Sequence, residues 1–124
     1  MADKKKIVEE INANFTNNDM EAFLSHCDEN FTWTMVGEKS NTGKAAIREW
    51  MKGMEDCDPP VFGVTNLLED GDVVVCNGDM KMKDKEGKTT DFSYCDIYRF
   101  SGDTVVELTS FVVPTDSKKS TASA

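Results

Sequence analysis

The sequence predicts a single α+β domain in which a curved antiparallel sheet wraps around three N-terminal helices. Up to residue 54 most apolar residues recur at helical spacing, whereas over residues 61–113 apolar and polar residues alternate between turn-forming clusters. Helices followed by a run of strands are typical of the α+β class, and 124 residues suffice for one core. We therefore expect one domain over residues 1–113 and a disordered tail over residues 114–124, where Ser, Thr, Lys and Ala predominate.

Three helices are expected in the first half of the chain. The first spans residues 3–17 and the second follows Asp19, which is placed to act as its N-cap. Thr42 is the expected N-cap of the third. The apolar residues of the three helices recur at i, i+3 and i+4: Ile7, Val8, Ile11 and Phe15; Met20, Phe23, Leu24 and Cys27; and Ile47, Trp50, Met51 and Met54.

Five strands are expected. Residues 31–36 (FTWTMV) alternate apolar residues with threonine, after a turn at residues 28–30 and before a polar loop at residues 38–41. Four more strands, separated by turns that contain Gly71, Gly87 and Gly102, form a meander. Their expected ranges are 61–68, 73–83, 89–100 and 104–113.

The alternation also predicts which residues share a face. If residues 85–87 form a three-residue loop with Gly87 left-handed, the even-numbered residues of the two flanking strands point to the apolar side. The facing pairs are then Met80 with Phe92, Gly78 with Tyr94, and Cys76 with Asp96. The opposite face carries polar and charged residues, namely Asn77, Asp79, Lys81, Asp91 and Arg99.

The last strand is expected to add an inner set and an outer set to these faces. The inner set is Val106, Leu108, Ser110 and Val112, and the outer set is Val105, Glu107, Thr109, Phe111 and Val113. Because the outer set is partly apolar, we expect a homodimer that forms through the outer sheet face.

Charge and composition exclude several classes of partner. The net charge is −9 and the basic residues form no stripe, which argues against nucleic acid and anionic membranes. The first residues lack the apolar stretch of a signal peptide, and no apolar run approaches the length of a membrane span. A cytoplasmic protein is the expectation.

The cysteines and the single histidine indicate neither a metal site nor a nucleophile. Four cysteines without a CxxC pair are read as reduced packing residues, over disulfides or a zinc site. His26 and Cys27 are adjacent on a helix and therefore point in different directions. The acidic residues around Gly71 lack the calcium-loop pattern and are interpreted as turn residues. We expect no metal and no cofactor.

Asp96 is the residue that does not fit its surroundings. It lies on the apolar face between Tyr94 and Tyr98, and burying an unpaired carboxylate costs several kcal/mol. Either it is a proton donor or oxyanion stabiliser with a raised pKa, or it is a structural aspartate bonded to a tyrosine or a backbone amide. Tyr94 and Tyr98 are likewise either hydroxyl donors of a site or core aromatics.

Three segments resemble the family that contains nuclear transport factor two, the SnoaL-like polyketide cyclases and the ketosteroid isomerases. They are FTNNDMEAFLSHCDENFTWTMVG, NTGKAAIREWM and YCDIYRFSGDTVVELTSF, of which GKAAIREW and DIYRF are the most specific. The resemblance implies a cone-shaped, cystatin-like fold and a pocket, frequently in a homodimer. It does not imply one reaction, because this scaffold hosts isomerases, cyclases, dehydratases, hydrolases and non-catalytic members.

The isomerase pattern carries over at one position and fails at two. Asp96 matches the family's oxyanion-hole aspartate, which stays protonated so that it can donate a hydrogen bond. The family's general-base aspartate is matched by Thr34, or by Met35 if the register slips by one. The family's helix tyrosine would lie near Ile11, where this chain has no tyrosine. The resemblance therefore argues against classical steroid isomerisation.

Two hypotheses remain for function. The first is a small-molecule enzyme of isomerase, cyclase or dehydratase type, with Asp96 polarising an oxygen and Tyr94 or Tyr98 assisting. The second is a non-catalytic ligand-binding or dimerisation module. The large side chains expected around Asp96 are either core or ligand-binding residues: Trp33 or Thr34, Trp50, Met51, Met54, Met80, Met82, Leu108 and Val112.

Overall fold

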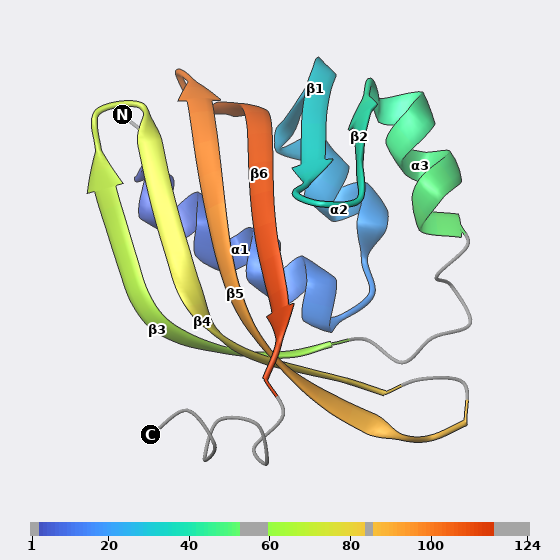
Figure 1. Cartoon of the computed structure of the whole chain (residues 1–124). Helices are drawn as coiled ribbons and strands as arrows, with labels where there is room; N and C mark the ends of the chain where they lie inside the picture. Colours follow the sequence, from blue (N-terminus) through green and yellow to red (C-terminus); the bar gives the residue numbers. More distant parts are fainter. Residues whose placement is uncertain (1–2, 53–59, 84–85, 116–124) are drawn as a thin grey trace.

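A six-stranded sheet curves around α1 and α2, and α3 packs at one edge, in the computed structural model of the protein (Figure 1). The structure describes residues 3–52, 60–83 and 86–115. The elements in chain order are α1 (Lys4–Thr16), α2 (Met20–Ser25), β1 (Cys27–Met35), β2 (Lys39–Thr42), α3 (Lys44–Lys52), β3 (Val61–Asp70), β4 (Val73–Lys83), β5 (Thr89–Ser101) and β6 (Thr104–Pro114).

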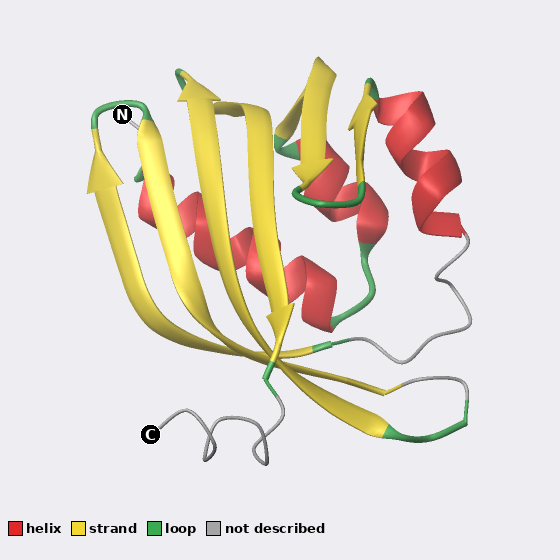
Figure 2. Ribbon diagram, in the orientation of Figure 1, coloured by secondary structure: helices red, strands yellow, loops and turns green. Residues whose placement is uncertain are grey.

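The sheet is open, with strand order β2-β1-β6-β5-β4-β3. Strands β3 to β6 form the predicted antiparallel meander, and β1 joins it by pairing in parallel with β6. The helices lie on one side of this sheet, and the long strands β3, β4 and β5 bend below α1 (Figure 2). The predicted α+β class and the curved sheet around helices are confirmed.

The first two helices begin at side-chain caps. Asp3 accepts a hydrogen bond from the Lys6 amide at 3.3 Å, and Asp19 accepts one from the Ala22 amide at 3.1 Å. Such caps satisfy amides that have no partner within the helix. The predicted N-cap role of Asp19 is therefore confirmed.

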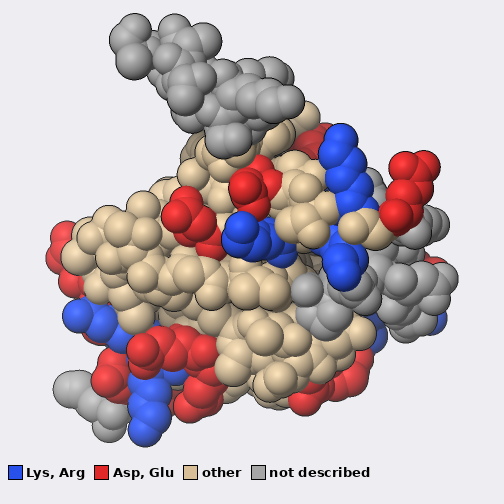
Figure 3. Space-filling model, turned by 90° about the horizontal axis from the view of Figure 1, so that it is seen from below, with Lys and Arg blue, Asp and Glu red and all other residues tan. Residues whose placement is uncertain are grey.

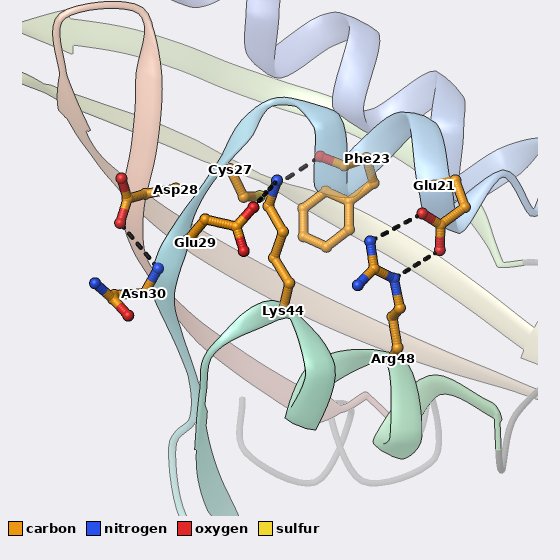
Figure 4. Close-up of polar contacts among 8 residues, drawn as sticks. All are labelled: Glu21, Phe23, Cys27, Asp28, Glu29, Asn30, Lys44 and Arg48. Atoms are coloured by element: carbon orange, nitrogen blue, oxygen red, sulfur yellow. Dashed lines mark hydrogen bonds and ion pairs between the residues drawn. The ribbon is translucent and has the colours of Figure 1, made fainter.

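Charged side chains attach α3 to the rest of the molecule (Figure 4). The Arg48 guanidinium donates to both carboxylate oxygens of Glu21 on α2, at 2.9 and 3.1 Å, and Lys44 lies 3.7 Å from Glu29 on β1. Ile47 and Met51 are the buried residues of α3. Since at least one partner of each ion pair is well exposed, burial of these two apolar residues provides most of the attachment.

The predicted register between β4 and β5 is confirmed. Met80 faces Phe92, Gly78 faces Tyr94 and Cys76 faces Asp96, in the order that the alternation predicts. Gly87 has the expected left-handed conformation, with φ of 85°. The even-numbered residues of β5 from Tyr94 to Phe100 are buried under the helices, and we call this side of the sheet the inner face.

Three local predictions for the segment before the third helix were wrong. Residues 28–30 are not a turn but part of β1, which begins at Cys27 and shifts its register against β6 before Thr32. The polar segment expected as a loop contains β2, an edge strand whose short polar sequence has no apolar alternation. Thr42 ends β2 rather than capping α3, because Gly43, with φ of 93°, lies between them.

The inner and outer sets predicted for β6 needed one correction. Leu108 and Ser110 are buried and Phe111 and Val113 are exposed, as expected, but Val105 is fully buried although it was assigned to the outer set. The pairing of β5 with β6 shifts between Arg99 and Phe100, so that Phe100 faces Val105. This irregularity reverses the alternation at the start of β6.

Three other expectations concern residues outside the described ranges, namely Met54, Cys57 and the tail from residue 116 onward. Pro114, the first residue of the expected tail, is the last residue of β6. None of the described helices has the length and apolar character that are needed to cross a bilayer. Figure 3 shows acidic and basic side chains beside one another around a wide uncharged area.

Candidate functional site

Asp96 lies on the inner face at the centre of the sheet. It faces Cys76 on β4 and Ser110 on β6, and only 7% of its surface is exposed. The strand places it there because the alternation of β5 buries Tyr94, Tyr98 and Phe100 on the same side. A carboxyl group in this position lacks most of the water that would stabilise its charge.

Ser110 and Trp33 form a directed chain of hydrogen bonds that ends on Asp96. The Trp33 indole Nε1–H donates to Ser110 Oγ at 3.0 Å, and Ser110 hydrogen-bonds the Asp96 side chain. An indole N–H can only donate, so the serine oxygen accepts from Trp33 and its own proton points to the carboxylate. Strand β1 therefore influences Asp96 although it does not pair with β5.

The environment makes Asp96 a weaker acid than an exposed aspartate. Burial raises the pKa of Asp96 from 3.8 to about 6, and the hydrogen bond from Ser110 opposes this rise because it stabilises the charged form. The group therefore titrates close to neutral pH, where a side chain can both give and take a proton.

The two tyrosines that flank Asp96 differ in their hydrogen bonding. The Tyr94 hydroxyl donates to the Gly63 carbonyl at 3.0 Å and lies 3.7 Å from Cys76 Sγ. The Tyr98 hydroxyl is buried and has no hydrogen-bond partner among the described residues. Burial raises the pKa of both tyrosines, so both hydroxyls keep their protons at neutral pH.

Gly78 makes the contact of Tyr94 with β3 possible. A Cβ atom on Gly78 would overlap the Gly63 carbonyl oxygen, so only glycine allows β3 to approach this closely. The register of β3 shifts between Val64 and Asn66 at the same place. The Tyr94 ring also packs edge-on against Phe62, with centroids 5.4 Å apart. Tyr94 is thus held by β3 at both its ring and its hydroxyl.

The sequence analysis did not identify Asn12 as a site residue. Asn12 lies on the buried side of α1 with Val8, Ile11 and Phe15, and only 9% of its surface is exposed. Its side-chain amide donates to Cys76 Sγ at 3.6 Å, whereas its Oδ1 is buried without a partner. The sequence did contain a signal for Asn12. Position 12 is four residues after Val8 and three before Phe15, so helical spacing places a polar residue within the apolar stripe of α1.

Ser110 was placed on the inner face by the sequence but was not assigned a role in the site. It was the only polar member of the even-numbered set of β6. That set therefore contained the signal, but only the folded chain shows which groups Ser110 contacts.

Most of the predicted ligand-binding residues lie in the core or against it. Trp33, Met51, Met80 and Leu108 are buried in the core, and Trp50, Met82 and Val112 are partly buried against it. Trp33 and Trp50 meet edge to face, with centroids 5.0 Å apart.

Thr34 lies on the outer face, since it alternates with Trp33, and its hydroxyl is 2.8 Å from the Ser40 hydroxyl. Trp33, rather than Thr34, is therefore the residue of this strand that lies near Asp96. Met54, the remaining predicted residue, is outside the described ranges.

His26 and Cys27 do not form a nucleophile and base. His26 lies 3.7 Å from Glu10, and the Cys27 thiol donates to the Phe23 carbonyl at 3.5 Å. Burial raises the pKa of Cys27 to about 12, which keeps the thiol protonated. No group of three or more His, Cys, Asp or Glu side chains suited to a metal occurs within residues 3–52, 60–83 and 86–115.

Comparisons with known proteins give the family context of this arrangement. A family model described as a SnoaL-like domain matches residues 8–108. The search of curated proteins finds no match.

Three solved structures illustrate the structural likeness. An NTF2-like protein of unknown function from Cytophaga hutchinsonii is 27% identical, with 90% of this chain and 100% of that chain covered and a TM-score of 0.71. An NTF2-like protein of unknown function from Burkholderia pseudomallei has a TM-score of 0.83 at 14% identity over 98% and 97% of the two chains.

The third structure is that of SalBIII, described as an epoxide hydrolase/cyclase-like enzyme with a role in pyran ring formation in the polyether salinomycin. It has a TM-score of 0.78 at 21% identity over 88% and 89% of the two chains. The Burkholderia protein and SalBIII are 14% and 21% identical to this chain, so they establish the shared fold alone.

Proposed function

Since the chain belongs to the family of SnoaL-like domains and has the cone-shaped NTF2-like fold, we propose that its inner sheet face binds a small hydrophobic molecule. The proposed reaction is an isomerisation, cyclisation or dehydration of a hydrophobic carbonyl or cyclic compound. The fold alone does not select among these, because it carries many chemistries. SalBIII, a cyclase-like enzyme of the same fold, supports the choice of reaction class.

The observation that carries the proposal is the buried carboxyl group of Asp96. In the proposed step, Asp96 gives its proton to a substrate oxygen on which negative charge develops, and Ser110 stabilises the carboxylate that remains. With a pKa of about 6, roughly one molecule in ten carries this proton at pH 7, against about one in a thousand for an ordinary aspartate.

Of the two tyrosines, Tyr98 has the hydroxyl that is available to contact a ligand, at a group other than the oxygen on which Asp96 acts. The Tyr94 proton is already donated to the Gly63 carbonyl, whereas the Tyr98 hydroxyl has no partner. The classical steroid isomerase mechanism receives no support, because Trp33 rather than a carboxylate faces inward on β1, and α1 contains no tyrosine.

The test combines a ligand screen with a pH profile. A panel of bicyclic ketones and epoxides is screened for binding by protein-detected NMR, and each binder is assayed for turnover. We expect kcat/KM to fall as the pH rises through about 6, because the protonated carboxyl is the active form. Asp96→Asn should reduce turnover at least 100-fold.

Asp79→Asn is the matched control, since Asp79 is an exposed aspartate of the same sheet. It should leave the rate unchanged. An unchanged rate in Asp96→Asn, or a rate that rises through pH 6, would contradict the role of Asp96 as a proton donor.

A second candidate function, a dimerisation module, is favoured by the outer face of the sheet. Phe111, Val113, Leu68 and Val61 expose between 40% and 64% of their surface there. Exposed apolar residues that gather on one face mark interaction sites. We propose that two copies of the chain pair through this face.

Sedimentation velocity tests the dimer. The native chain should sediment as a dimer at micromolar concentration and Phe111→Lys as a monomer. Thr16→Lys, which adds the same charge on the helical side of the molecule, should remain dimeric. A native chain that is monomeric at high concentration would contradict the interface.

A further inference from the structure

Two buried polar atoms near Asp96 have no hydrogen-bond partner within the described part of the chain. They are Asn12 Oδ1 and the Tyr98 hydroxyl. Two other side-chain atoms of the described residues share this property, on Asn14 and Asn41, but both of those residues are partly exposed. A buried polar group without a partner is unfavourable and rare in folded proteins. Two of them on the same inner surface call for a physical reason.

Both residues interact with Cys76. Asn12 reaches across from α1 to donate to Cys76 Sγ at 3.6 Å. Tyr98 faces Val74 on β4, two residues from Cys76 on the same face, and its hydroxyl is near enough to Cys76 and Asp96 to interact with them electrostatically. The unpaired acceptor and the unpaired hydroxyl therefore border the part of the inner face that holds Asp96.

The two tyrosines of β5 form an internal comparison. They have the same chemistry, face the same way and are four residues apart, yet the Tyr94 hydroxyl is bonded at 3.0 Å and the Tyr98 hydroxyl is unbonded. Tyr98 is also the more deeply buried, with 0% of its surface exposed against 3%. A purely structural residue at position 98 would be better served by phenylalanine, which fills the same space without an unpaired hydroxyl.

We propose that Asn12 and Tyr98 together recognise a hydroxyl group of the ligand. The Tyr98 O–H donates to the oxygen of that hydroxyl, and the hydroxyl donates to Asn12 Oδ1. A hydroxyl group, unlike a ketone or an ether, can fill both roles at once. The inference rests on the small-molecule site proposed above, where Asp96 acts on a separate oxygen. The ligand class is therefore a hydrophobic carbonyl compound that also carries a hydroxyl or enol group.

The first experiment compares the two tyrosines without any ligand. Tyr98→Phe should raise the melting temperature by about 2–5 °C, because it removes an unpaired buried hydroxyl. Tyr94→Phe should lower it by a similar amount, because it breaks the bond to Gly63. A lower melting temperature in Tyr98→Phe would show that a resident water already satisfies this hydroxyl, and it would overturn the proposal.

The second experiment measures discrimination between matched ligands. The dissociation constants of 1-tetralone and of its mono-hydroxylated analogues are measured by NMR titration. The best hydroxylated analogue should bind the native chain at least 10-fold more tightly than the parent ketone. Tyr98→Phe and Asn12→Leu should each reduce this ratio to about one and change the affinity for the parent less than twofold.

The outcomes separate this inference from the function on which it rests. If ketone and hydroxyketones bind equally well, hydroxyl recognition is overturned and the small-molecule site stands. If none of the compounds binds, the site itself is contradicted and the inference fails with it. Loss of affinity for the parent ketone in Tyr98→Phe would indicate a packing defect rather than lost recognition, and would also overturn the assignment.

Discussion

The two faces of the sheet depart from the usual distribution of residues in opposite ways. The inner face and the side of α1 that packs on it bury polar groups: Asp96 and Ser110 on the sheet and Asn12 on α1 are each less than 10% exposed. The outer face exposes apolar groups such as Phe111 and Val113 beside the ion pairs of Lys81 with Asp91 and of Arg99 with Glu107. The buried polar groups lower the stability of the folded chain, and the exposed apolar groups favour association with a partner.

The difference between the faces indicates two kinds of function. A buried polar cluster is suited to a small molecule, because the groups that it leaves unpaired can be satisfied by a ligand of matching chemistry. An exposed apolar surface with charges around it is suited to a protein, because water is expelled over a wider area. Substitutions on the two faces should therefore have different consequences.

The largest expected difference concerns two phenylalanines. Phe31 on β1 is fully buried and Phe111 on β6 is 40% exposed. Phe31→Ala should lower the free energy of unfolding by about 3–5 kcal/mol, since it leaves a cavity in the core. Phe111→Ala should lower it by less than about 1 kcal/mol in dilute, monomeric protein. Urea denaturation measures both, and equal effects would contradict the assignment of the faces.

The pH dependence of stability isolates the contribution of Asp96. Because burial raises its pKa from 3.8 to about 6, the folded chain binds the proton more tightly than the unfolded chain. The contribution of this proton to the free energy of unfolding is fully present below pH 3.8 and is lost as the pH rises to about 6. At 1.36 kcal/mol per pKa unit, the loss is about 3 kcal/mol.

Asp96→Asn should lack this loss, since asparagine does not ionise. Chemical denaturation of the native chain and the variant at pH 4 and pH 7 measures the difference, and other carboxylates cancel in the comparison. The same pH dependence in both proteins would show that Asp96 is not held in an apolar environment.

Two serines, one on each face, test whether stability and the pKa of Asp96 depend on the hydrogen bonds of the inner face. Ser110→Ala removes the acceptor of Trp33 and the donor to Asp96, so the free energy of unfolding should fall by about 1–3 kcal/mol. The pKa of Asp96 should also rise above about 6, which carboxyl-detected NMR can follow.

Ser93→Ala removes only an exposed contact to Asp79 at 3.4 Å and is the control. It should change neither the free energy of unfolding nor the pKa of Asp96 measurably. A pKa of Asp96 that stays the same in Ser110→Ala would remove Ser110 from the site.

The smallest effect is expected at the ion pairs of the outer face. Lys81→Ala breaks the 3.2 Å contact with Asp91, in which both side chains are more than half exposed. The free energy of unfolding should fall by less than about 0.5 kcal/mol, and 0.5 M NaCl should abolish the difference. A larger effect that resists salt would indicate that this face is covered, as in a tight dimer.

Most elements were predictable because their signals are local. The apolar stripe of α1 and the alternation of β4 and β5 depend on residues only a few positions apart, and so do the caps of α1 and α2. The errors fell where pairing with a distant strand overrides the local pattern. Strand β2 is polar and exists because it pairs with β1, and Val105 is buried because β6 shifts its register against β5.

The sequence by itself determined that Asp96 lies on the buried side of β5, because strand alternation follows from the chain's own period of two residues. Only the tertiary structure decided what surrounds that carboxyl group. Trp33 and Ser110 are 77 residues apart in the chain, and Asn12 and Cys76 are 64 apart. Hydrogen bonds between such distant residues depend on how the strands and α1 are packed, and so does the unpaired hydroxyl of Tyr98. A pattern read along the chain carries no information on that packing.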